Sequence, residues 1–186
     1  TNSKLQIIES LFRQHHSALH WFCLQYVKSK EDADEIVNDT FMALWERDEP
    51  IDPNRNIKPL LYTIVRNKSL NLIKKRKIEI TDVEDGFEIV SDVISPIEHI
   101  QARETEEFIL KAIDALPPKC RQIFVMSRRE YLSNKEIAAI LEISEKTVEN
   151  QITIAIKSIK LALNKRNDKG TPMVLFPWIM ALLLDY

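Results

Sequence analysis

Glycine is scarce in this chain, with 2 glycines among 186 residues. A phosphate-cradling P-loop needs several glycines in one short loop, so that class of nucleotide site is excluded. No nucleophile stands near a base in a catalytic pattern, and we expect no enzyme activity, no cofactor and no small-molecule substrate. The 2 cysteines, Cys23 and Cys120, lie within apolar helical patterns and offer no framework of disulfides. We expect both to be small core residues.

Long hydrophobic runs are also missing. The longest is Met173–Leu184, whereas a membrane-spanning helix needs about 20 residues. The first residues do not form a signal peptide. These two absences predict a soluble, cytoplasmic protein.

Aromatic residues make up 8% of the chain, and no segment alternates between apolar and polar residues as a strand would. Helical spacing dominates instead, so the sequence predicts an all-α protein. The expected helices cover about 3–28 with Ser3 as its cap, 29 to about 47, 57–77, 95–115, 119–131, and a pair within 133–166. They predict two helical domains joined by an acidic flexible linker: 1–77, then the linker 78–94, then 95–168, followed by an apolar tail 169–186.

The formal net charge of −2 hides a strong segregation of charge along the chain. Segments 31–49 and 79–107 are acidic, whereas 66–77 and 119–169 are basic. Such blocks suggest several partners of opposite sign.

The most informative segment is 133–166. Ser133 and Glu136 form the pattern of a capping box, and Ala138 leaves room for a second helix to approach. A three-residue turn follows, and Ser144 can cap a longer helix with an inward stripe of apolar residues. This layout predicts a helix-turn-helix whose second helix enters the major groove of DNA. A plain αα-hairpin with a polar face is the alternative, but cap, small residue, turn length and polar tip together favour the DNA-binding motif.

Three segments carry a family resemblance: EDADEIVNDTFMALWE (31–46), LLYTIVRNKSLNLIKKRK (60–77) and LPPKCRQIFVMSRREYLSNKEIAAILEISEKTVENQI (116–152). In this order and at this separation they resemble the extracytoplasmic-function (ECF) group of bacterial RNA polymerase sigma factors. The segments LPPKCRQIF and KTVENQI are most similar to the sigma group found in Bacteroidetes, which is often paired with a membrane anti-sigma factor.

The resemblance implies that the acidic second helix docks on the clamp helices of the largest subunit of core RNA polymerase. It also implies that the flap region of the polymerase is a partner of the chain. Carboxylates and an amide on one face would form charge-assisted hydrogen bonds with an arginine-rich partner. The candidate residues are Asp34, Glu35, Asn38, Asp39 and Met42. A solvated acidic helix face is the alternative interpretation of the same residues.

The third helix and the loop before it correspond to the element that opens the −10 promoter segment. Reading a base there requires flipping it into a pocket, while a positive groove follows the strand backbone. The candidates are Asn54, Arg55, Asn56, Tyr62, Arg66, Asn67, Lys74, Lys75, Arg76 and Lys77, with Lys68 in the same groove. The family's tryptophan near the start of this helix is Leu60 here, so strand capture would rely less on stacking. The alternative for the last four cations is a solubilising helix end.

The helix-turn-helix would bind the −35 element as duplex. Base-edge candidates are Lys146, Glu149, Asn150 and Thr153, and phosphate candidates are Thr147, Gln151 and Lys157. Two departures from the family concern glycines: the turn glycine is replaced by Glu142, and the glycine before Ser133 by Tyr131. Both positions must then accept a side chain.

Several alternatives stay open at this stage. The acidic linker would thread the polymerase cleft, although an ordinary disordered spacer has the same composition. The apolar tail folds back or docks on a partner such as an anti-sigma factor, with membrane contact third. A conventional helix-turn-helix repressor or activator is one rival function. Another is an anti-sigma-like, metal-sensing interaction protein using His16, His20 and Cys23, although zinc would need a fourth ligand.

Overall fold

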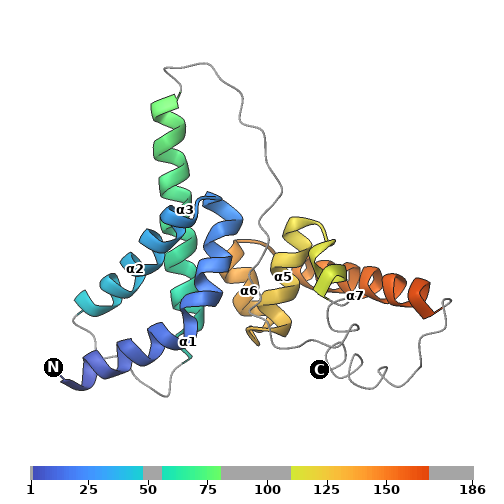
Figure 1. Ribbon diagram of the computed structural model, residues 1–186, viewed down its shortest axis with the longest axis horizontal. Coiled ribbons are helices and arrows are strands. Elements are labelled where there is room, and N and C mark those ends of the chain that lie inside the picture. The colour runs from blue at the N-terminus through green and yellow to red at the C-terminus, as the bar shows by residue number, and fades with distance from the viewer. Residues whose placement is uncertain (1, 48–55, 81–109, 168–186) are drawn as a thin grey trace. The chain divides into compact units, whose positions relative to one another are not determined.

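The computed structural model of the chain describes residues 2–47, 56–80 and 110–167 (Figure 1). The chain divides into two compact units, residues 1–96 and 97–186. All regular structure in the described ranges is helical, which confirms the all-α prediction. None of the helices in these ranges combines the length with the apolar character that crossing a bilayer demands.

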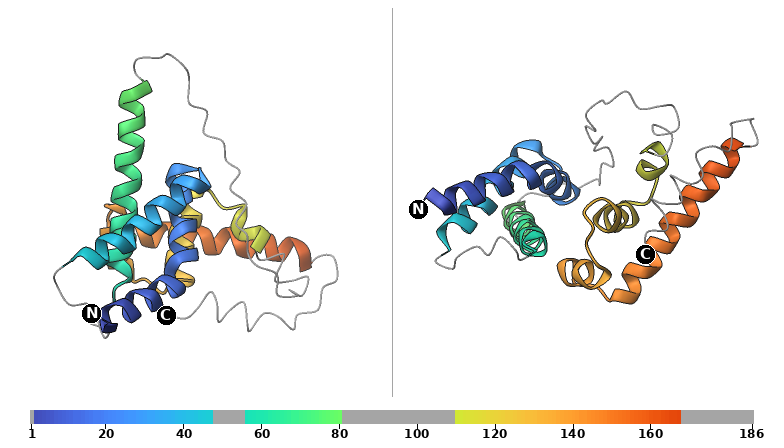
Figure 2. Two further views of the ribbon diagram at one scale, coloured as in Figure 1. Left: turned by 60° about the vertical axis from the view of Figure 1, so that its left-hand side comes forward. Right: turned by 90° about the horizontal axis from the view of Figure 1, so that it is seen from below.

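The first unit consists of α1 (Asn2–Val27), α2 (Lys30–Glu46) and α3 (Lys58–Ile80). Contacts between α1 and α2 run in opposite directions along the chain, from Phe12 against Phe41 to His20 against Asp34, so the two helices are antiparallel. The core is formed by fully buried side chains, among them Leu19, Phe22, Val37, Leu44, Leu61 and Val65. Figure 2 shows α3 beside both other helices, with its last turns extending beyond them.

Helix ends in this unit follow local chemistry. The hydroxyl of Ser29 accepts a hydrogen bond from the backbone N–H of Asp32 at 3.2 Å, so Ser29 caps α2. At the other end of α2, Lys4 Nζ donates to the carbonyl oxygens of Trp45 and Arg47 at 2.5 and 2.6 Å. A cation is favourable there because the last carbonyls of a helix lack intrahelical donors.

Three predictions about this unit need correction. Ser3, predicted to stand before the first helix as its cap, lies within α1, which begins at Asn2. The helical spacing of Leu5 with Ile8 and Phe12 predicts that Leu5 is on the buried side, but it is 52% exposed. The predicted linker start at residue 78 falls inside α3, which continues to Ile80.

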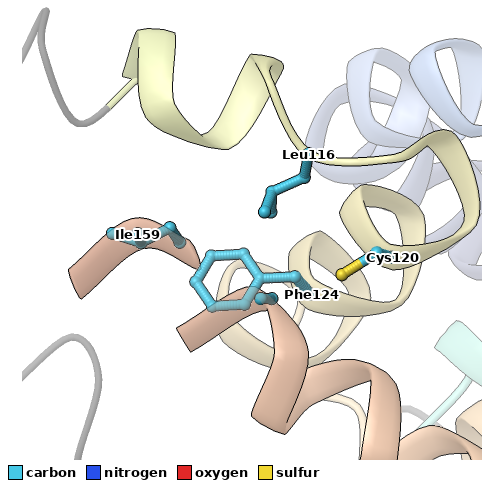
Figure 3. Close-up of a cluster of buried hydrophobic side chains, with 5 residues drawn as sticks. Leu116, Cys120, Phe124 and Ile159 are labelled. Atoms are coloured by element: carbon cyan, nitrogen blue, oxygen red, sulfur yellow. The ribbon is translucent and has the colours of Figure 1, made fainter. Parts of the chain in front are cut away.

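The second unit contains a helical stretch at residues 110–114, followed by α5 (Pro118–Arg128), α6 (Asn134–Leu141) and α7 (Glu145–Asn167). Leu116, Cys120 and Phe124 pack against Ala155 and Ile159 of α7 (Figure 3). Pro118 opens α5 at the first helical position, where its missing N–H costs nothing. Cys120 and Cys23 are both free and buried, as predicted for core residues.

The helix α5 ends earlier than the predicted Tyr131. The N–H groups of Arg129 and Glu130 both donate to the carbonyl of Val125, and the N–H of Leu132 donates to Met126. These bonds close the helix and bring Leu132 into the core at 3% exposure, while Tyr131 takes a left-handed φ of 55°. The predicted helix start at Ser95, the acidic linker beyond Ile80 and the apolar tail lie outside the described residues.

Candidate protein and nucleic-acid interfaces

The pair α6–α7 has the local geometry of a helix-turn-helix. Ser133 Oγ accepts from the N–H of Glu136 at 3.3 Å, and Glu136 Oε2 accepts from the N–H of Ser133 at 2.8 Å, which completes the predicted capping box. The turn between the helices is residues 142–144, and Ser144 Oγ accepts from the N–H of Thr147 at 3.1 Å. The sharp turn depends on Glu142, whose left-handed conformation (φ 55°, ψ 48°) ends α6.

One face of α7 is buried and the opposite face is exposed. Val148, Ile152, Ala155 and Ile159 form the predicted inward stripe, each with at most 4% exposure. The exposed side chains in the −35 set are Lys146, Thr147, Glu149, Asn150, Thr153 and Lys157, while Gln151 is half-buried. The structure therefore places all seven of these residues on α7, six of them open to solvent.

Side-chain bonds within α7 decide which groups of its exposed face are left to bind an outside partner. Lys146 Nζ and Glu149 Oε2 form an ion pair at 3.0 Å. Thr153 Oγ1 donates to the carbonyl of Glu149 at 2.9 Å, so the hydroxyl proton of Thr153 is used within the helix. Among the described residues, Asn150 and Lys157 have no side-chain bond of this kind, which leaves an amide and an ammonium group for an outside partner.

The predicted polymerase-docking residues share one exposed face of α2. Asp34, Glu35, Asn38, Asp39 and Met42 are all exposed, with Met42 at 56%, while the other face of the helix supplies the core. The face is bordered by a polar contact on each side. His20 Nε2 of α1 lies 3.2 Å from Asp34 Oδ1, and Lys68 Nζ of α3 lies 2.9 Å from Asp39 Oδ2.

The far end of α3 presents a group of cations. Lys74, Lys75, Arg76 and Lys77 are exposed, as is Asn67, whereas Arg66 is half-buried. Arg76 is held by α2: its two terminal nitrogens donate to the two carboxylate oxygens of Asp32 at 2.5 and 2.8 Å. An acidic residue in the first turn of α2 is favourable against the helix dipole, but the pairing of Asp32 with a residue 44 positions away has no local signal.

Two of the −10 candidates have structural roles here. Tyr62 is 2% exposed, and its ring packs edge-on against Phe22 with centroids 4.8 Å apart. Its burial argues against a direct base contact, because it shares the inward face of α3 with Val65. Asn56 Oδ1 accepts from the N–H of Lys58 at 3.2 Å and thereby supports the start of α3. Asn54 and Arg55 lie outside the described residues.

His16 and His20 contact each other, whereas Cys23 has a different partner. The rings of His16 and His20 stack with centroids 6.1 Å apart, and Cys23 Sγ lies 3.2 Å from Ser69 Oγ. Burial raises the pKa of the Cys23 thiol, which disfavours the thiolate that metals bind. In the parts of the chain that the structure describes, no three histidine, cysteine or acidic side chains gather as a metal site would require.

Comparison with known proteins agrees with this geometry. The family description "Sigma-70 region 2" matches residues 11–78, and "Sigma-70, region 4" matches residues 108–159. The first match covers α1 from Leu11, all of α2, and α3 up to Ile78, and the second covers α5, α6 and most of α7.

Individual relatives span most of the chain. The RNA polymerase sigma factor NccH of Alcaligenes xylosoxydans xylosoxydans is 29% identical over 150 residues, which is 78% of this chain and 80% of NccH. The ECF RNA polymerase sigma factor SigM of Bacillus subtilis (strain 168) is 24% identical, covering 85% and 96% of the two chains. The ferric citrate uptake sigma factor FecI of Escherichia coli (strain K12) is 27% identical, covering 80% and 86%.

Among solved structures, the sigma factor RpoE, crystallised with the anti-sigma factor NepR from Bartonella quintana, shares the fold with a TM-score of 0.60. It is 24% identical, and the alignment covers 84% of this chain and 96% of RpoE. Fold, both region matches and full-length relatives thus point to one conclusion: the chain belongs to the sigma-70 family of RNA polymerase sigma factors, in the ECF group that directs transcription initiation at specific promoters.

Proposed function

We propose that the two units of this sigma factor divide promoter recognition between them. The first unit docks on the clamp helices of core RNA polymerase through the exposed face of α2 and holds the −10 strand along α3. The second unit binds the −35 duplex with α7 and contacts the flap region. Sigma factors are not enzymes, and the catalysis belongs to the polymerase.

The observation that carries this proposal is the pairing of two oppositely charged surfaces in one unit. The acidic face of α2 is exposed beside the cationic end of α3, and the helix-turn-helix lies in the other unit. A repressor that binds duplex DNA alone needs neither surface. A carboxylate face suits an arginine-rich protein partner, whereas a lysine cluster suits a phosphate backbone.

Within α7 we assign roles by chemistry. Asn150 is the base-reading residue, because an exposed amide can donate and accept at once on an adenine edge. Lys157 binds a phosphate, because it is exposed and lies two turns further along the helix. Lys146, Glu149 and Thr153 complete the face near the bases, and Thr147 and Gln151 flank it.

The decisive experiment is run-off transcription with purified core polymerase and promoters identified from the RNA 5′ ends that appear on overexpression. Transcripts should require the added chain. Asn150→Ala should lower initiation mainly at promoters with the preferred −35 base. The free-energy difference between promoters with the preferred and the wrong base should shrink by about 1–3 kcal/mol. Lys157→Ala should weaken all promoters alike and reduce the salt dependence. Lys111→Ala removes the same charge from an exposed position before α5 and is the matched control. Transcription that does not depend on the chain would refute the proposal.

For the −10 element, Lys74, Lys75 and Lys77 are proposed to bind the strand backbone, with Asn54, Arg55 and Asn67 near the flipped bases and Arg66 behind them. Permanganate footprinting of unpaired thymines in the open complex tests this assignment. Lys74→Ala combined with Lys75→Ala should reduce the reactive fraction while the −35 footprint persists. Loss of both signals together would contradict a separate −10 role.

We also propose that an anti-sigma factor restrains the chain in the cytoplasm, where RNA polymerase works. One support is the similarity of the segments LPPKCRQIF and KTVENQI to the Bacteroidetes sigma group. The other is the RpoE relative, which was crystallised with an anti-sigma factor. The apolar tail is a second surface for a protein partner. Size-exclusion chromatography with a candidate anti-sigma segment should give a 1:1 complex, and two separate peaks at micromolar concentration would exclude that partner.

A further inference from the structure

One ion pair connects the two surfaces that serve different partners. Lys68 Nζ of α3 lies 2.9 Å from Asp39 Oδ2 of α2, and both side chains are partly open to solvent, at 34% and 56% exposure. Asp39 belongs to the proposed docking face for polymerase, whereas Lys68 is one of the α3 cations in the groove expected to follow the −10 strand. The same contact therefore occupies one group from each surface.

These two groups cannot serve their partners while they hold each other. A phosphate that approached Lys68 would also approach the carboxylate of Asp39, and the two negative charges repel. An arginine of the partner protein that took the carboxylate would likewise be repelled by the ammonium group of Lys68. Because an exposed ion pair is weak, a partner that binds one group with good geometry can displace the other.

We propose that Asp39 withholds Lys68 from nucleic acid in the free protein, and that a cationic protein segment docking on Asp39 releases Lys68 to the DNA strand. This inference rests on the proposed function and adds a link between its two steps. Docking then raises the affinity for DNA through charge, without any change of fold. By reciprocity, DNA bound at Lys68 frees Asp39 and favours docking.

The neighbouring pair, Asp32 with Arg76, has a different character. The side chain of Asp32 is 12% exposed, and Arg76 binds both of its oxygens. A bidentate pair with a nearly buried acid is strong and fixes geometry. Asp32 also lies outside the exposed docking face, so no partner can reach it as directly as Asp39. This pair braces the end of α3 and is not part of the switch.

The test uses the free, full-length chain and a fluorescein-labelled single-stranded oligonucleotide of mixed sequence, with binding followed by anisotropy at about 50 mM salt, where surface charges are weakly screened. Asp39→Asn should bind the oligonucleotide about 2- to 5-fold more tightly, the range expected for the loss of one exposed ion pair. Asp34→Asn is the matched control. It removes the same charge from the same face at the same 56% exposure, but its partner is His20 on α1.

Lys68→Gln supplies the second arm. In the Asp39→Asn background it should return the affinity to that of the unmodified chain or below, whereas alone it should change little. A gain by Asp34→Asn equal to that of Asp39→Asn would show a general field effect and overturn the proposal. A gain that persists without Lys68 would overturn it as well. Polymerase is absent from this assay, so a negative result leaves the run-off experiment and the promoter function unaffected.

Discussion

Glu142 offers the sharpest test of how the helix-turn-helix is built. Its backbone is left-handed at φ 55° and ψ 48°, and its N–H donates to the carbonyl of Ala138. The next N–H, that of Ile143, donates to the same carbonyl at 3.0 Å. A residue with a Cβ pays for this conformation through a close contact with its own backbone, whereas glycine does not. Glu142→Gly should therefore stabilise the second unit.

The magnitude follows from two opposing terms. The left-handed conformation costs a non-glycine residue about 1–2 kcal/mol. Glycine loses about 0.5–1 kcal/mol more conformational freedom on folding than alanine does. The difference leaves a net gain of about 0.5–1 kcal/mol for glycine over alanine, which corresponds to about a 2- to 5-fold slowing of amide exchange wherever global opening of the unit limits it.

Hydrogen exchange of the backbone amides in α5–α7 of the full chain measures this effect without assuming that both units unfold together. Glu142→Ala is the control, because it removes the side-chain interactions of Glu142 and keeps the Cβ. Ala139→Gly places the same glycine at an exposed position within α6, where it should destabilise by about 1 kcal/mol. Equal exchange rates for Glu142→Gly and Glu142→Ala would refute the reasoning.

Three further results are expected. Phe124→Ala should lower the free energy of unfolding of the second unit by about 3–5 kcal/mol, since the ring is 2% exposed. Backbone amides of α5–α7 should then lose protection from hydrogen exchange, while those of α1–α3 keep theirs. Loss of protection in both units would contradict separate cores. Asp32→Asn should speed amide exchange in the last turns of α3, because Arg76 loses a bidentate partner, and unchanged exchange there would count against the brace. Burial, followed by the charge of Lys58, lowers the pKa of His15 from 6.5. Because the imidazole of the unfolded chain then binds a proton at higher pH than that of the folded chain, the first unit should lose stability as pH falls through about 6.5. Urea unfolding followed by circular dichroism between pH 7.5 and 5.5 should show a smaller loss of stability for His15→Gln.

Local features of the fold were predictable from the sequence. The capping box at Ser133, the cap at Ser29, the three-residue turn and the inward stripe of α7 all depend on residues within about four positions of each other. The two positions where the family has glycine, Glu142 and Tyr131, are both left-handed in the structure. Helix ends were less certain, because a helix stops where tertiary packing and its last hydrogen bonds stop it.

The surfaces were predictable only in part. Helical spacing placed the docking residues of α2 and the α7 residues on exposed faces, because those helices have one clear apolar stripe. The family resemblance placed Tyr62 among the −10 residues, whereas its ring is buried in the structure. An amphipathic tyrosine suits either face of a helix, and only the packing of α3 against Phe22 decides between them.

The sequence by itself determined that this protein is helical, where its helix-turn-helix lies, and which family it resembles, because periodicity, caps and turn residues act over short stretches of chain. The tertiary structure alone decided which charges meet. Lys68 with Asp39 and Arg76 with Asp32 are separated by 29 and 44 positions, and each pair depends on the register at which α3 packs against α2. That register is set by the buried side chains of all three helices together, and no local pattern encodes it.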